Sequence, residues 1–447
     1  MSLKITVIGT GYLGATHAAA MAELGFEVLG LDVVPEKIAM LERGETPMYE
    51  PGLDELLRAH VAGIEGSTGR LRFTTDFAEV AEFGDVHFVC VNTPQKHGEY
   101  ACDMSYVDSA IASLAPHLRR PALVVGKSTV PVGSADRLAA YLAGHAPAGA
   151  DAELAWNPEF LREGFAVQDT LHPDRIVVGV RGERAEKLLR EVYATPLGEG
   201  TPFVVTDFPT AELVKTAANS FLATKISFIN AMAEVCETAD GDVVKLAEAI
   251  GHDERIGKKF LRAGIGFGGG CLPKDIRAFM ARAGELGADQ ALTFLREIDS
   301  INMRRRGAMV EMAREALGGG SFLGKRVAVL GATFKPDSDD VRDSPALNVA
   351  GQIHLQGGQV TVYDPKGMDN ARKLFPTLGY AESAREAVRG ADVVLHLTEW
   401  REFRELEPEE LGEVAASRVV LDGRNALDPV PWREAGWTFR AMGRPTA

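Results

Sequence analysis

The chain has 447 residues, of which 46% are hydrophobic and 25% charged, and its formal net charge is −15. The chain is longer than a single hydrophobic core usually supports, which predicts two to three domains, and the composition is typical of a soluble globular protein. The acidic balance argues against a nucleic-acid or anionic-membrane surface, but it still allows a local basic pocket for a phosphate. No apolar run is long enough for a membrane span, and the start MSLKITVIGTG enters a strand without a signal peptide, so we expect a cytoplasmic protein.

Short β-rich runs alternate with helical stretches such as 15–24 through the first half of the chain. Two further runs, 175–180 and 202–207, extend the same predicted sheet. This alternation is typical of a doubly wound α/β domain, which we place at 1–207. Four runs are apolar without clean alternation, as buried parallel strands should be: 4–9, 27–32, 86–92 and 122–128.

The character of the sequence changes at about residue 208. The stretch after Pro209 has no internal glycine or proline and carries apolar residues at helical spacing, so it predicts one long helix in a mostly helical domain, 208–317. The glycine-rich segment 318–326 is a predicted linker. Strand patterns then return in a third domain, 318–447, so we expect two Rossmann-like doubly wound α/β domains joined by a helical one. The predicted strands of the third domain are 326–331, 359–365, 391–398 and 417–423.

The segment GTGYLG, residues 9–14, follows the first predicted strand and opens a helix, and Asp32 ends the next strand. Its glycines permit a tight turn and a close approach of the backbone to a pyrophosphate at the helix N-terminus. Asp32 would accept hydrogen bonds from the adenosine ribose and repel a 2′-phosphate, which favours NAD over NADP. The alternative is a plain glycine turn.

The segment GFGGGCLPKD, residues 266–275, places Cys271 among glycines, with Lys274 and a helix predicted to begin near Pro273. A nearby positive charge and a helix N-terminus both lower a thiol pKa, so Cys271 is a candidate nucleophile. The alternative is an incidental small residue. The cysteines show no metal-ligand or disulfide spacing, so we expect no metal, and we expect Cys90 and Cys236 to be core residues.

An NAD site combined with a nucleophilic cysteine predicts oxidation beyond an aldehyde. Thiolate addition would give a thiohemiacetal, loss of a second hydride a thioester, and water would release the acid. Lys215 and Asn219 share a helix face and, with Asp275, Glu159 and Glu163, could supply acid, base and oxyanion contacts. The alternative for Lys215 and Asn219 is a solvated helix face.

Three basic residues near predicted strand ends indicate either a phosphate site or solvated surface charges: Lys335, Arg342 and Arg424.

Several stretches together resemble the UDP-glucose/GDP-mannose dehydrogenase family, in order from about residue 3 to residue 425. They include VIGTGYLG, NPEFLREG, the helix beginning ELVKTAANSF, RIGKKFLRAGIGFGGGCLPKD and ATFKPDSDDVRDSP. The resemblance implies oxidation of the C6 alcohol of UDP-glucose to UDP-glucuronate with two NAD⁺ and no metal. GDP-mannose or TDP-glucose are alternative substrates of the same chemistry.

The resemblance also implies roles by position. Cys271 matches the nucleophile, Glu159 the base for thioester hydrolysis and Lys215 an oxyanion contact, while Asn219, Asp275 and Thr129 complete the catalytic set. A homodimer would form through the long helix. Expected NAD contacts are Gly9, Gly11, Tyr12, Leu13, Gly14, Asp32, Lys37, Thr93, Thr129, Glu163 and Arg342. Expected nucleotide-sugar contacts are Glu159, Phe160, Leu161, Lys215, Asn219, Phe267, Gly268, Lys335, Arg424 and, from a neighbouring subunit, Arg255.

Two further interpretations stay open from the residues alone. A two-electron dehydrogenase or an epimerase that keeps its cofactor would need Cys271 only as a structural residue. A silent nucleotide-sugar sensor would need no nucleophile at all, and the full set of candidate catalytic residues argues against it. Gly270 departs from the family, whose members often carry serine or tyrosine beside the thiol, and this departure bears on substrate specificity.

Overall fold

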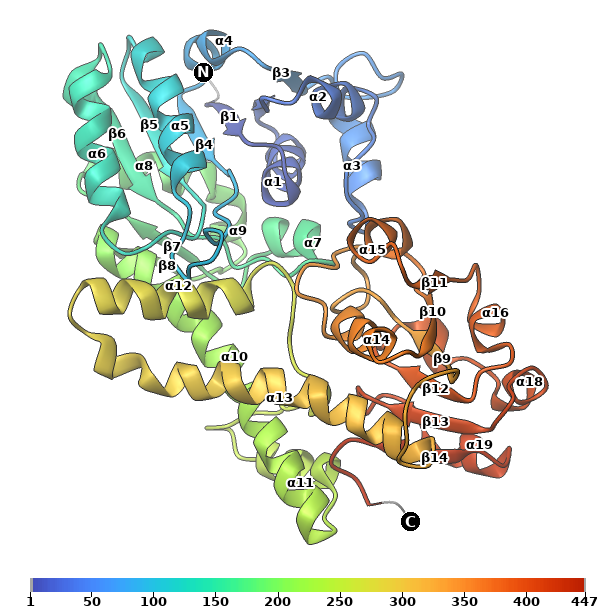
Figure 1. Ribbon diagram of the computed structural model, residues 1–447. Coiled ribbons are helices and arrows are strands. Elements are labelled where there is room, and N and C mark those ends of the chain that lie inside the picture. Colours follow the sequence, from blue (N-terminus) through green and yellow to red (C-terminus); the bar gives the residue numbers. More distant parts are fainter. Residues whose placement is uncertain (1–2, 446–447) are drawn as a thin grey trace. The chain divides into compact units, whose positions relative to one another are not determined.

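The computed structural model describes residues 3–445, so residues 1–2 and 446–447, at the outer ends of the first and third predicted domains, lie outside the described residues. The chain divides into two compact units. The first holds the chain up to Ala218 together with Arg277–Leu286, and the second holds Asn219–Ile276 and the chain from Gly287 onward. Figure 1 labels the elements of both.

The first unit contains an eight-stranded sheet in the order β3-β2-β1-β4-β5-β6-β7-β8. The predicted parallel strands are confirmed, but β6 pairs with β7 in the antiparallel sense through Trp156 and Gly179, a reversal that the sequence pattern did not predict. The prediction also missed β3 and β6. The strands are β1 (Lys4–Ile8), β2 (Glu27–Leu31), β3 (Leu71–Thr74), β4 (Val86–Val89), β5 (Ala122–Gly126), β6 (Ala152–Trp156), β7 (Ile176–Gly179) and β8 (Phe203–Thr206).

Two hydrophobic cores cover the two faces of this sheet, because successive strand residues point to opposite sides. Ile5 and Val7 of β1 join one core, and Ile8 joins the other. The first face packs against α1 (Tyr12–Glu23), α2 (Pro35–Glu42), α3 (Leu53–His60), α7 (Ala166–Leu171), α8 (Glu183–Val192) and α9 (Ala194–Gly198). The second packs against α4 (Phe77–Phe83), α5 (Ser105–Leu114), η1 (Ala115–His117) and α6 (Ser134–His145), with η2 (Gly149–Asp151) before β6.

The predicted long helix is confirmed as α10 (Phe208–Ala239). It is followed by α11 (Val243–Gly251), α12 (Leu272–Glu285), η3 (Asp289–Leu292) and α13 (Thr293–Ala316). The division between the units falls within α10 and within α12, so both helices contribute residues to each unit. Among residues 3–445, none of the helices combines the length and apolar character that crossing a membrane would need.

The second unit contains a six-stranded parallel sheet in the order β11-β10-β9-β12-β13-β14, drawn in orange and red in Figure 1. Cores again lie on both faces, so the predicted pair of Rossmann-like sheets with a helical region between them in sequence is confirmed. The strands are β9 (Arg326–Leu330), β10 (Gln359–Tyr363), β11 (Gly379–Tyr380), β12 (Val393–His396), β13 (Val419–Asp422) and β14 (Thr438–Ala441). The helices are α14 (Pro345–Leu355), α15 (Met368–Leu374), α16 (Ala384–Val388), α17 (Arg401–Arg404), α18 (Pro408–Gly412) and α19 (Pro429–Glu434).

Candidate active site

The glycine turn after β1 contains two glycines that the fold requires and one that it does not. Gly9 has a φ of +88°, and a Cβ on Gly14 would lie 1.7 Å from the carbonyl oxygen of Gly9. A Cβ on Gly11 would meet nothing closer than Asn92 Oδ1 at 3.9 Å. Gly11 is also the N-cap of α1 and provides no side-chain cap. The turn therefore presents main-chain N–H groups to open space, which is the arrangement that binds a pyrophosphate.

Asp32 directly follows β2 and turns back to the glycine turn. Its Oδ2 accepts hydrogen bonds from Thr10 N at 3.0 Å and from Lys37 Nζ at 2.8 Å. Burial acts to raise the pKa of Asp32, but the bonds from Lys37 and Thr10 hold it below its ordinary value. The carboxylate is therefore ionised at neutral pH, as recognition of a ribose and exclusion of a 2′-phosphate both need.

Several of the other predicted cofactor residues lie in the same compact unit as this turn, whereas Arg342 belongs to the second unit. Tyr12 donates its hydroxyl to the buried carboxylate of Glu50, which also accepts the amides of Gly164 and Ala166 at 2.7 Å each. Glu163 therefore lies on a segment that Glu50 ties to the first turn of α1. Leu13 packs against the first core, Thr93 is buried after β4, and Thr129 is half-buried after β5.

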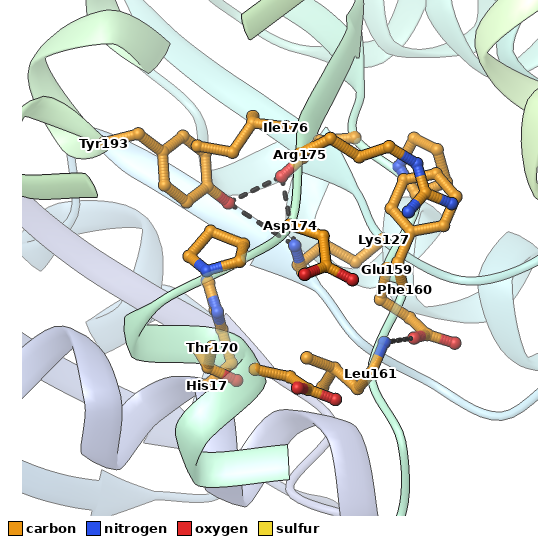
Figure 2. A pocket seen from close by; sticks show the side chains of 14 residues that line it. His17, Lys127, Glu159, Phe160, Leu161, Thr170, Asp174, Arg175, Ile176 and Tyr193 are labelled. Atoms are coloured by element: carbon orange, nitrogen blue, oxygen red, sulfur yellow. Dashed lines mark hydrogen bonds between the residues drawn. The ribbon is translucent and has the colours of Figure 1, made fainter. Parts of the chain in front are cut away.

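Lys215 of α10 is buried and pairs with Glu159. Its Nζ lies 3.0 Å from Glu159 Oε1, and Glu159 Oε2 accepts the amide of Leu161 at 2.6 Å. The Lys215 ammonium also lies 5.7 Å from the centre of the Phe160 ring. Lys215 and Asn219 are 4% and 7% exposed, so the solvated-face alternative is wrong for both. Figure 2 shows Glu159 and Phe160 together at one side of a cavity in the first unit.

Cys271 lies immediately before the first residue of α12 and is exposed, and its carbonyl accepts the amide of Asp275 at 2.9 Å. The predicted helix start beside the thiol is thus confirmed, and the positive end of a helix dipole favours thiolate. Asp275 is 1% exposed, accepts Asn219 Nδ2 at 2.6 Å and pairs with Lys274. The structure therefore brings the side chains of Asn219 and Asp275 together and places Cys271 one helical turn before Asp275. Cys90 and Cys236 are buried, also as predicted.

The glycines before Cys271 are explained by close packing against residues 342–345. A Cβ on Gly268 would lie 2.3 Å from the carbonyl oxygen of Asp343, and Gly269 N donates to the carbonyl of Arg342 at 2.9 Å. A Cβ on Gly270 would lie 2.3 Å from the guanidinium carbon of Arg342. Gly270 therefore makes room for the arginine, and a larger residue at this position would have to displace it.

Arg424 fastens the glycine loop to the end of β12. Its side chain is 11% exposed and donates to the carbonyls of Leu397, Gly266 and Phe334 at 2.8, 2.8 and 3.1 Å. Burial lowers the pKa of Arg424, and the neighbouring Glu399 carboxylate opposes that shift.

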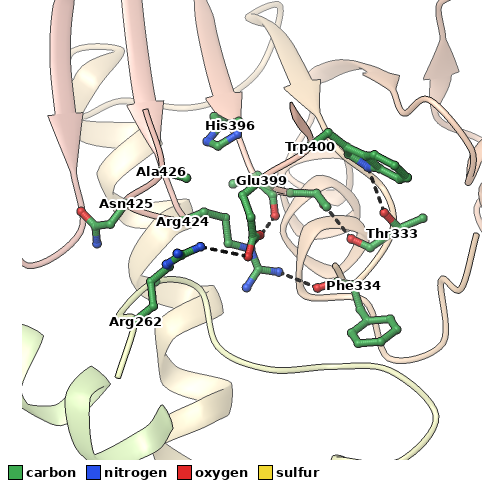
Figure 3. Close-up of polar contacts among 12 residues, drawn as sticks. Arg262, Thr333, Phe334, His396, Glu399, Trp400, Arg424, Asn425 and Ala426 are labelled. Carbon is green, nitrogen blue, oxygen red and sulfur yellow. Dashed lines mark hydrogen bonds and ion pairs between the residues drawn. The ribbon is translucent and has the colours of Figure 1, made fainter. Parts of the chain in front are cut away.

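Glu399 lies between two arginines, as Figure 3 shows. Its carboxylate oxygens are 3.5 Å from Arg424 Nε and 3.7 Å from Arg262 Nη1. Two cations around one carboxylate leave a net positive charge, which fits an anionic ligand. Lys335 is half-buried, with its Nζ 5.4 Å from the centre of the Phe334 ring, while Arg255 is exposed and pairs with Asp253.

Sequence reasoning missed Lys127, Glu399 and Glu212. Glu212 on α10 is 2% exposed and accepts the amides of Gly133 and Ala135 at 2.7 Å each, where α6 begins. Burial raises its pKa above the ordinary value. Glu212 thereby holds the loop after Thr129 to the helix that carries Lys215. These partners are distant in sequence, so no local pattern indicates them.

Comparison with known proteins gives a consistent result along the whole chain. Models of the UDP-glucose/GDP-mannose dehydrogenase family match in three parts: the NAD binding domain at 3–197, the central domain at 209–304 and the UDP binding domain at 328–429. A UDP-glucose 6-dehydrogenase of Rhizobium meliloti is 41% identical over 99% of this chain and 100% of its own. One of Rickettsia conorii is 40% identical over 99% of both chains.

Solved structures agree with this assignment. A UDP-glucose dehydrogenase from Pyrobaculum islandicum has a TM-score of 0.89 at 35% identity and covers 100% of this chain and 98% of its own. A UDP-D-ManNAc dehydrogenase from Pyrococcus horikoshii has a TM-score of 0.86 at 28% identity, with 100% of both chains covered. The chain belongs to the UDP-glucose/GDP-mannose dehydrogenase family, and it is an NAD-dependent oxidoreductase of nucleotide sugars.

Proposed function

We propose that this chain oxidises the C6 alcohol of UDP-glucose to the carboxylate of UDP-glucuronate through a covalent intermediate on Cys271. The observation that carries the proposal is the exposed thiol at the start of α12, beside the hydrogen-bonded pair of Asn219 and Asp275. A structural or binding role needs no exposed thiol at a helix N-terminus. The choice of UDP-glucose rests on the names of the similar proteins in Rhizobium and Rickettsia.

The cofactor residues fit NAD. The uncapped N-terminus of α1 and the open space at Gly11 suit a pyrophosphate, and Asp32 suits a ribose without a 2′-phosphate. When bound, NAD⁺ accepts a hydride in each of the two oxidations. We assign NAD binding to a domain of residues 1–207. A helical domain, 208–317, would carry the thiol loop. The domain 318–447 would bind the nucleotide sugar, where Arg424 and Lys335 supply positive charge.

The chain's own residues have the following roles in the proposed reaction. The Cys271 thiolate forms a bond to the C6 aldehyde carbon, and the negative charge that develops on oxygen is stabilised by the Lys215 ammonium and the Asn219 amide. After the second oxidation the intermediate is a thioester. Glu159 takes a proton from the attacking water, the carbon–sulfur bond breaks, and the thiolate is regenerated as the carboxylate leaves. Asp275 and Thr129 hold that water.

We also propose that a second copy of the chain covers one face of α10. Phe221, Phe228 and Val235 recur at heptad spacing on this helix and are 66%, 48% and 57% exposed. Arg255 would reach the sugar of the neighbouring copy. Analytical ultracentrifugation tests the dimer, and Phe228→Glu is expected to shift the protein to a monomer.

The test of the function is the NADH yield from limiting UDP-glucose run to completion with excess NAD⁺. Two NADH per sugar are expected, together with loss of acid formation in Cys271→Ala. One NADH per sugar would mean that the aldehyde is the product and that the thioester does not form. Turnover of GDP-mannose or TDP-glucose but not UDP-glucose would leave the chemistry intact and contradict the choice of substrate.

A further inference from the structure

Lys127 is a buried cation for which the proposed reaction has no role. It directly follows β5 and is 7% exposed. Its Nζ donates to two uncharged oxygens, Asn157 Oδ1 at 3.0 Å and the Tyr193 hydroxyl at 3.4 Å. Within residues 3–445, no carboxylate lies at ion-pair distance from it. Burying an ammonium group without a carboxylate partner costs free energy, so this arrangement calls for a functional explanation.

The hydrogen bonds of Lys127 fix the segment that carries Glu159. Asn157 Oδ1 accepts both Lys127 and the Tyr193 hydroxyl, the latter at 2.6 Å, and Asn157 Nδ2 donates to the carbonyl of Val177 at 2.9 Å. The main-chain amide of Asn157 is also bonded, to Gly126. Asn157 thus makes hydrogen bonds through its side-chain oxygen, its side-chain nitrogen and its main-chain amide. Glu159 follows two residues later, after Pro158, whose ring restricts the backbone.

Lys127 and Glu159 line the same cavity, which Figure 2 shows from close by. The cavity has a volume of about 50 Å³, enough to hold water. The charged and titratable groups that face Lys127 or line this cavity come from several elements: His17 of α1, Cys90 after β4, Glu159, Asp169 of α7, Asp174, Arg175, Tyr193 and Lys215 of α10.

Most of the immediate neighbours of Lys127 are uncharged. Burial raises the pKa of Cys90 to about 12, despite the nearby Lys127. Burial likewise raises the pKa of Tyr193, and burial together with Lys127 lowers the pKa of His17. Burial also lowers the pKa of Lys127 itself. The closest polar contacts of Lys127 are therefore the uncharged oxygens of Asn157 and Tyr193.

We propose that Lys127 is a positioning residue for thioester hydrolysis: through Asn157 it orients the segment bearing Glu159. This inference rests on the proposed function, in which Glu159 activates water. Steps that form the thioester depend on Cys271, Lys215 and Asn219. Loss of Lys127 should therefore slow release of the acid and leave the two oxidations nearly unchanged.

The test compares Lys127→Met and Lys127→Gln with wild type in rapid-mixing assays with UDP-glucose and NAD⁺. Methionine removes the donor to Asn157 Oδ1, and glutamine, whose shorter side chain offers a neutral donor, keeps the test usable should methionine prevent folding. The expected result in each is a burst of two NADH per subunit, then steady turnover slowed by on the order of tenfold or more.

Tyr193→Phe removes the other hydrogen bond to Asn157 Oδ1 and should show the same pattern, whereas Lys187→Met, at an exposed position of α8, is the matched control. The control should show no burst. Variants of Lys127 that lose burst and turnover in parallel would overturn the inference and leave a purely structural lysine. If wild type yields no NADH from any of the three nucleotide sugars, the proposed function fails, and the inference fails with it.

Discussion

Six strands of the first sheet follow the same order as the six strands of the second, and the two sheets differ in which polar groups they leave for a ligand. In both, a glycine directly follows the first strand in sequence, and its amide donates to the last carbonyl of the second strand: Gly9 to Leu31 and Gly331 to Tyr363. In both, an aspartate follows that second strand, Asp32 in the first sheet and Asp364 in the second.

The two aspartates have different surroundings. Asp32 is bonded to Thr10 and to Lys37, whose side chain is 27% exposed. Asp364 is 1% exposed, and one of its oxygens accepts the amides of Ala332 and Thr333, the Thr333 hydroxyl and the Trp400 indole at 2.7 to 3.1 Å. Hydrogen-bond donors of the chain itself therefore surround the Asp364 carboxylate, and no ribose could bind it.

The helices that follow differ in the same way. Helix α1 begins directly after the glycine turn with no side-chain cap, whereas α14 begins at Pro345 and is capped by Ser344, whose hydroxyl accepts the amide of Leu347. The comparison teaches that the first sheet leaves an uncapped helix N-terminus beside an acid whose partner Lys37 is partly exposed, whereas the chain itself caps the helix and encloses the acid of the second sheet.

The largest expected effect is from Asp364→Ala. This change leaves the buried donors around the carboxylate unsatisfied, so the second unit should lose about 4 kcal/mol of stability. Urea unfolding followed by tryptophan fluorescence reports mainly on this unit, because three of the four tryptophans, Trp400, Trp432 and Trp437, belong to it. Asp32→Ala, in the first unit, is the control and should leave the transition of the second unit unchanged. An equal loss of stability of the second unit in the two variants would contradict the different roles assigned to Asp32 and Asp364.

Gly14→Ala should come next, at about 3 kcal/mol, because its Cβ would collide with the carbonyl oxygen of Gly9. Gly11→Ala, in open space, should change stability by less than about 0.5 kcal/mol yet weaken NAD binding. Calorimetric titration with NAD⁺ and thermal unfolding separate these effects. Normal NAD affinity in Gly11→Ala would contradict a pyrophosphate at this turn.

Asp32→Ala should weaken NAD binding by about 2 kcal/mol, or roughly thirtyfold, through loss of charged hydrogen bonds to the ribose. It should also raise the relative affinity for NADP. Since the pKa of Asp32 lies below its ordinary value of about 3.9, its contribution to stability and binding is present above that pH and is lost as the pH falls through the lowered pKa. NAD affinity should therefore be flat from about pH 5 to 8 in wild type, and a drop in that range would contradict this assignment.

Trp400→Phe should have the smallest effect. It removes one indole donor from Asp364 while keeping an aromatic ring in the core, so we expect a loss of about 1 kcal/mol in the second unit. Fluorescence of the remaining Trp432 and Trp437 can follow the urea transition. A loss as large as that of Asp364→Ala would show that packing, rather than the indole hydrogen bond, dominates this site.

Local patterns predicted much of this molecule. The central strands were found because they are uniformly apolar, whereas β3, β6, β11 and β14 were missed because they are short or carry charged and small residues. The antiparallel pairing of β6 with β7 could not be predicted, because hydrophobic periodicity does not indicate the direction of a strand in a sheet. The glycine turn and Cys271 lie in local motifs, but the partners of Lys127, Glu212 and Asp364 come from distant segments, and only the fold brings them together.

The central claim is that Cys271 carries the sugar as a thioester that Glu159 helps to hydrolyse. The most direct measurement is the intact mass of Glu159→Gln after mixing with UDP-glucose and NAD⁺, followed by peptide mapping. We predict a covalent adduct of the mass of a UDP-glucuronyl group on the peptide that contains Cys271, absent from the same variant with Cys271→Ala. Wild-type-like acid production with no adduct, or an adduct on another residue, would contradict the account.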